Sequence, residues 1–202
     1  MDVKEFLKNH FDFNFYPITV PAVICLLSIV PCVLSLPEKY GFENGIIENI
    51  QMVVLLITFI FCIKAKQYKK LFIFMALVIL LLALREVNYG RTIFFPVPGQ
   101  ENMYYSWKDI KYGFLVHPFV AVYIISSLAY FAFNKLYFAV WEIFTKIKLP
   151  VLNISLMAIG ICLGVYAEKY THSFVFEEMA ELLFYLSLSS IIYLYAFNKN
   201  FR

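Results

Sequence analysis

Long apolar segments alternate along the chain with short segments rich in charge. A bilayer core of about 30 Å is crossed by about 20 apolar residues in a helix. The pattern therefore predicts an all-α polytopic integral membrane protein, with residues 1–202 forming one transmembrane domain, a six-helix bundle. The six predicted spans cover about 17–36, 46–63, 71–89, 113–133, 149–168 and 177–197.

Lysines gather on one side of this pattern. They precede the first span, fill the connection 64–70, recur in 134–148 and follow the last span at Lys199. Cytoplasmic loops carry an excess of lysine and arginine, so we expect the N- and C-termini to be cytoplasmic. Segments 3–15 and 134–148 alternate apolar and charged residues at helical spacing, which predicts interfacial helices.

The composition agrees with a membrane protein. Hydrophobic residues make up 62% of the chain and charged residues 15%, whereas soluble domains carry about 25% charged residues. A net charge of +3 without a basic or glycine-rich motif predicts no nucleic-acid partner. Membrane lipid is the expected partner, with a homo-oligomer or a partner membrane protein left open. The abundance of Lys, Asn, Ile, Phe and Tyr favours a bacterial cytoplasmic (inner) membrane.

Four spans carry polar residues at a similar depth. Counting about 1.5 Å per residue from the cytoplasmic end of each span places these residues roughly 19 to 29 Å above it. A lone charge in hydrocarbon costs at least ~2.5–3.5 kcal/mol, so unpaired placement is disfavoured. We therefore expect one buried polar layer in the outer third of the bilayer, made by Glu48, Gln51, Arg85, Glu86, His117, Glu178 and Glu181.

Helical spacing suggests which of these side chains share a face. Residues three apart lie on one face, which pairs Glu48 with Gln51 and Glu178 with Glu181. By the same rule Arg85 pairs with Asn88, and Glu86 is turned about 100° away. The layer holds more acids than bases, so protons, a bound cation or a cationic ligand must relieve the excess.

These features predict a membrane-embedded enzyme, a hydrolase or transferase that acts on a lipid or lipid-linked substrate. Glutamates and histidines supply general acids and bases, and arginines hold anionic groups. The predicted catalytic residues are Glu48, Glu86, His117, Glu178 and Glu181. The predicted substrate-binding residues are Gln51, Arg85, Asn88 and Arg91. A divalent metal such as zinc or manganese would suit a set made of His117, His172, Glu178 and Glu181.

Two other roles stay open on the sequence alone. A non-enzymatic membrane subunit could use the polar layer to bind a partner helix or a lipid headgroup, because polar side chains also bond across helices. An oligomeric ion channel or transporter is the second. The apolar cytoplasmic two-thirds of the spans argue against a pore within one chain, but not against a pore between protomers.

The segment "IIENIQ" (46–51) resembles the glutamate–asparagine element of the alkaline ceramidase-like membrane hydrolases. Intramembrane histidine and carboxylate residues near one face add to the resemblance, which implies a membrane hydrolase. The resemblance covers a handful of residues. The chain departs from that family because it lacks a paired-histidine HxxxH element and has six predicted spans rather than seven.

Overall fold

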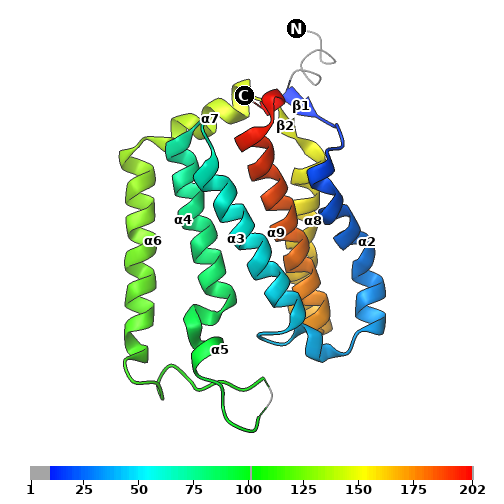
Figure 1. The fold of residues 1–202 in the computed structure, drawn as a ribbon, viewed down its shortest axis with the longest axis vertical. Helices are drawn as coiled ribbons and strands as arrows, with labels where there is room; N and C mark the ends of the chain where they lie inside the picture. The colour runs from blue at the N-terminus through cyan, green and yellow to red at the C-terminus, as the bar shows by residue number, and fades with distance from the viewer. Residues whose placement is uncertain (1–9, 101, 202) are drawn as a thin grey trace.

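A computed structural model describes residues 10–100 and 102–201, and its architecture is an all-α bundle (Figure 1). The α-helices are α2 (Val20–Ser35), α3 (Ile46–Lys64), α4 (Lys69–Glu86), α5 (Arg91–Phe94), α6 (Val116–Phe133), α7 (Leu136–Lys146), α8 (Val151–Tyr166) and α9 (Phe174–Phe197). Short helical turns join them: η1 (Pro17–Thr19), η2 (Glu38–Gly41), η3 (Asn88–Gly90), η4 (Gly113–Leu115), η5 (Ala167–Thr171) and η6 (Lys199–Phe201). Two-residue strands β1 (Phe11–Asp12) and β2 (Leu149–Pro150) pair in parallel.

The predicted all-α bundle is confirmed. Five helical segments are individually long and apolar enough to cross a membrane, and they match the predicted spans one, two, four, five and six. The third predicted span corresponds to α4 followed by the helical segment Asn88–Phe94, and the two are bent by 57° relative to each other. Counting that bent pair as one span gives six.

The bend after α4 corrects the prediction for 71–89. The helix ends at Glu86, and the next turn contains three residues with left-handed backbone angles: Asn88 (φ 43°), Tyr89 (φ 55°) and Gly90 (φ 90°). Such angles cannot continue a right-handed helix. Asn88 therefore does not share a helical face with Arg85, and that part of the prediction is wrong.

Helix α9 forms the centre of the bundle, with α2, α3 and α8 packed around it (Figure 1). Its contact with α8 is close at Gly160, where a methyl group would lie 2.8 Å from the backbone nitrogen of Phe184. Helix α6 stands at the edge of the bundle against α4 and α7, and none of its residues is buried.

Both described ends of the chain lie at the same end of the bundle, as an even number of spans requires (Figure 1). Helix α7 crosses that end, so the segment 134–148 contains the helix predicted there. The predicted helix over 3–15 falls partly outside the described residues, and residues 11–12 form strand β1 instead. Helix α5 lies at the opposite end of the bundle, where α3 and α9 begin and α4 ends (Figure 1). The polar residues predicted on α3, α4 and α9 belong to those helix ends.

Candidate functional site

Three helices bring their polar residues together at the end of the bundle that lies away from the termini. Helix α3 begins there with Glu48 in its first turn, α4 ends there with Arg85 and Glu86, and α9 begins there with Glu178 and Glu181. Because chain direction alternates between packed spans, a helix start and a helix end meet at one level (Figure 1).

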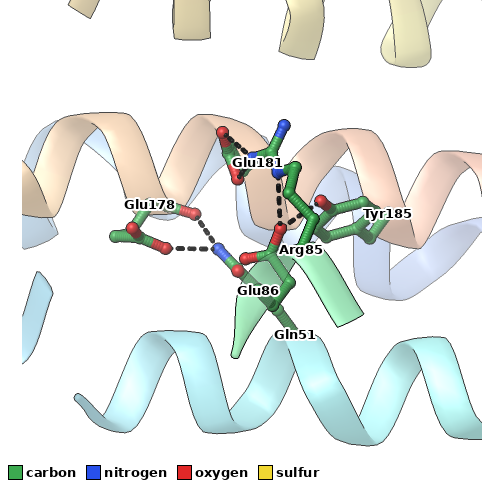
Figure 2. Close-up of polar contacts among 6 residues, drawn as sticks. All are labelled: Gln51, Arg85, Glu86, Glu178, Glu181 and Tyr185. Carbon is green, nitrogen blue, oxygen red and sulfur yellow. Dashed lines mark hydrogen bonds and ion pairs between the residues drawn. The ribbon is translucent and has the colours of Figure 1, made fainter. Parts of the chain in front are cut away.

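Arg85 links two glutamates (Figure 2). One terminal nitrogen of its guanidinium donates to both carboxylate oxygens of Glu181, at 2.6 Å each. Its Nε lies 3.2 Å from Oε1 of Glu86. The Glu86 side chain is 4% exposed, while that of Arg85 is 53% exposed. The arginine thus reaches from the rim of the site to a buried carboxylate. The expectation that Glu86 points away from Arg85 does not hold for this long side chain.

Tyr185 completes the carboxylate network formed by Arg85, Glu86 and Glu181, although it was not among the residues predicted from the sequence. Its hydroxyl donates a 2.6 Å hydrogen bond to Oε1 of Glu86 (Figure 2). The side chain is buried in the middle of an apolar helix, so the local sequence does not distinguish it from a packing residue. The sequence feature that could have identified Tyr185 is its position four residues after Glu181, which places both side chains on the same face of α9.

Gln51 connects α3 to Glu178 on α9. Its Nε2 donates to the backbone oxygen and to Oε2 of Glu178, both at 2.8 Å. Glu48, one turn earlier, is 4% exposed and accepts a hydrogen bond from the backbone N–H of Asn44. Oε1 of Gln51 and Oε1 of Glu48 are buried without a hydrogen-bond partner among the described residues. Unpaired buried acceptors are uncommon and mark a place where a donor or a cation fits.

A pocket of about 440 Å³ adjoins this network. Glu178 belongs to both, because it lines the pocket and also bonds to Gln51. The lining combines charged side chains with apolar ones. The lining residues are Gly41, Glu43, Arg91, Asn102, Met103, Tyr104, Phe174, Glu177 and Glu178.

Arg91 is the cation of the pocket. Its guanidinium lies 3.7 Å from Oε1 of Glu43, and its Nε is buried without a partner among the described residues. Tyr104 donates to the backbone oxygen of Glu43 at 3.1 Å. Burial raises the pKa of Tyr104 above its ordinary value, so its hydroxyl remains a donor at neutral pH. Sequence reasoning missed Glu43 and Asn102 because they lie in loops, where helical spacing carries no information.

The two predicted histidines lie elsewhere. His117 is exposed on α6, which packs on α4 and α7 at the edge of the bundle. His172 is exposed in the turn after η5, with φ 51°. Within residues 10–100 and 102–201, neither histidine joins a group able to hold a metal. The predicted metal set of both histidines with Glu178 and Glu181 is therefore not assembled.

A different set is assembled. Glu86, Glu178 and Glu181 each offer a carboxylate oxygen, and these three atoms lie within 4.8 Å of one another. The network can therefore hold a cation or protons and exchange a proton with a group in the pocket.

Comparisons with protein-family models, with curated proteins and with solved structures find no match to this chain.

Proposed function

We propose that the protein is a membrane-embedded enzyme, a hydrolase or transferase, that acts on a lipid or lipid-linked substrate. One observation carries the proposal: Glu178 stands at the junction of the buried carboxylate network and the pocket. A carboxylate so placed can exchange protons with a bound substrate while its neighbours control its charge.

The pocket suits an amphiphilic substrate. Arg91 lines the pocket with a partly exposed guanidinium, which can bind a phosphate or carboxylate group. Met103 and Phe174 line the same pocket and are half exposed, so they provide apolar contact for the start of an acyl or prenyl chain. The flanks of the surrounding helices are apolar, which suits entry from the bilayer.

The roles of the residues follow from their positions. Arg91 binds the anionic group beside the bond that reacts. Glu178 accepts the proton of the attacking water or alcohol. At the same time, the oxygen of that water or alcohol forms a bond to the carbonyl carbon or phosphorus. The leaving oxygen departs with its electron pair and takes the proton back from Glu178. Atoms and charge therefore balance over one turnover.

The test uses the full chain in vesicles made from a bacterial total lipid extract supplemented with polyprenyl phosphate. Mass spectrometry follows the loss of one lipid species and the appearance of its product. We expect Glu178→Gln to lower the rate by ~100-fold or more, the usual contribution of a general base. Arg91→Gln should raise KM. Glu168→Gln is the matched control, because Glu168 is an exposed acid at the same end of the bundle.

Two results would overturn the proposal. One is wild-type protein that is well folded and changes no lipid in the mixture. The other is a Glu178→Gln variant that retains the wild-type rate. Glu178→Asp separates catalysis from simple binding, because it keeps the charge but withdraws the carboxylate by one methylene. A site that only docks a partner tolerates this change, whereas proton transfer does not.

We also propose that the termini face the cytoplasm of a bacterial cell and that the pocket faces outward. The lysine-rich connection between α3 and α4 adjoins the start of α7, at the end of the bundle where the termini lie. The positive-inside rule supports this orientation. Single cysteines introduced at Lys66 and at Gly99, with the native cysteines replaced, should be labelled in intact cells by an impermeant reagent only at residue 99.

A further inference from the structure

The carboxylate network is short of positive charge. Glu86, Glu178 and Glu181 place three carboxylates together, and Arg85 is the one cation bonded to them among the described residues. With these four groups ionised, three negative charges and one positive charge leave −2. Glu48, also buried at this end of the bundle, accepts a hydrogen bond from the backbone N–H of Asn44 instead and is not part of this count. Charge inside a membrane-spanning bundle is costly, so the excess requires a counter-charge. One divalent cation supplies +2, which balances the three carboxylates and Arg85.

The spacing of the carboxylates suits a single ion. Their three oxygens lie within 4.8 Å of one another. Two ligands on opposite sides of Ca²⁺ are about 4.6–5.2 Å apart, and those of Mg²⁺ about 4.0–4.2 Å, twice the metal–oxygen distance. Three oxygens within 4.8 Å of one another can therefore surround one such ion.

Gln51 provides an observation that does not depend on the acids. Its side chain is fully buried (0% exposed), and its Oε1 has no hydrogen-bond partner among the described residues. The amide reaches from α3 into the space between Glu178 and Glu86 (Figure 2). A buried acceptor without a partner destabilises the folded protein. A cation bound by the carboxylates would remove that destabilisation by taking the amide oxygen as a fourth ligand.

The donor atoms indicate the class of cation. All four are oxygens, from carboxylates and an amide, and the two predicted histidines, His117 and His172, lie outside the group. Oxygen ligands suit Mg²⁺, Ca²⁺ and Mn²⁺, whereas zinc sites in proteins are built mainly from nitrogen and sulfur. Arg85 does not block the site, because a carboxylate offers about four lone-pair positions.

We propose that this end of the bundle binds one hard divalent cation through oxygens of Gln51, Glu86, Glu178 and Glu181. Arg85 and Tyr185 are positioning residues, which hold Glu181 and Glu86 in place from the other side. The site shares Glu178 with the proposed active site. Its test needs no substrate, so either proposal can fail while the other stands.

The experiment titrates Mn²⁺ into the full chain, purified in detergent and first treated with a chelator. Electron paramagnetic resonance measures free Mn²⁺, and Mg²⁺ and Ca²⁺ are then added as competitors. We expect one saturable site per chain that millimolar Mg²⁺ or Ca²⁺ empties of Mn²⁺. Glu86→Gln, Glu178→Gln and Gln51→Leu should each weaken binding by ~10-fold or more. Glu168→Gln should leave binding unchanged.

The competing explanation is that two of the three carboxyls are protonated. The melting temperature of the same purified proteins distinguishes protonation from a bound cation. Glutamine has the shape of protonated glutamic acid, so under that explanation Glu178→Gln has the melting temperature of wild type. Adding Mn²⁺ would then leave the melting temperature of wild type unchanged. Monodisperse wild type without a saturable site, or a site that survives Glu178→Gln, overturns the proposal. Should the glutamine variants aggregate, Gln51→Leu and the wild-type competition decide the question.

Discussion

The bond from Tyr185 to Glu86 allows a direct test of the charged network. Tyr185→Phe removes one hydroxyl and keeps the ring that fills the core. The lost bond is 2.6 Å long and ends on a carboxylate that is 4% exposed. Hydrogen bonds to charged groups contribute about 1.5–3 kcal/mol to stability. Arg85 Nε still lies 3.2 Å from the same oxygen, so we expect a loss at the lower end, about 1.5–2 kcal/mol.

Tyr123→Phe is the matched control. The Tyr123 hydroxyl also donates a hydrogen bond between helices, at 2.8 Å, but its acceptor is the neutral backbone oxygen of Leu77. Such bonds contribute about 0.5–1.5 kcal/mol. In a chain of this length 1 kcal/mol moves the melting temperature by roughly 2–4 °C. We therefore expect Tyr185→Phe to melt roughly 3–8 °C below wild type, and Tyr123→Phe to show the smaller shift of the two, roughly 1–6 °C.

The assay is thermal unfolding of purified protein in one detergent, followed by the monodisperse fraction or by tryptophan fluorescence. Equal shifts for the two variants, or a smaller shift for Tyr185→Phe, would refute the idea that this hydroxyl stabilises a charged Glu86. The same samples test the positioning role, since Tyr185→Phe should also weaken Mn²⁺ binding several-fold and Tyr123→Phe should not.

Two further predictions concern packing and pH. At Gly160 an added methyl group would meet Phe184 N at 2.8 Å, whereas at Gly164 the nearest atom is Ala180 Cβ at 3.9 Å. Gly160→Ala should therefore cost about 1–3 kcal/mol, and Gly164→Ala should cost nothing measurable in the same unfolding assay. Equal melting temperatures would show that the close approach of α8 and α9 is wrong. Burial raises the pKa of Tyr104, so its contribution to stability is complete below its ordinary pKa of 10.0 and is lost as the pH rises through the folded value. The fall in melting temperature between about pH 9 and about pH 11 should be larger for wild type than for Tyr104→Phe, and equal falls would contradict this.

The sequence alone determines the spans and the level of the polar residues. Burying a backbone in lipid requires helices, and the length of each apolar segment sets where its helix leaves the bilayer. Counting residues along each span therefore places Glu48, Arg85 and Glu181 near one level, and the folded chain gathers them at one end of the bundle.

Only the tertiary structure decides which residues of that level meet, because residue counting gives height along a helix but not position around the bundle. His117 has a suitable height, yet α6 stands at the edge and leaves it outside the network. Tyr185 lies one turn deeper than Glu181, yet α4 and α9 both pack on α3, and this arrangement brings its hydroxyl to Glu86. Asn88 shares a predicted face with Arg85, yet the left-handed turn after Glu86 moves it off that face. The partner of each charge is thus set by the packing of whole helices and by the place where α4 ends, and neither is encoded in the local pattern of apolar and polar residues.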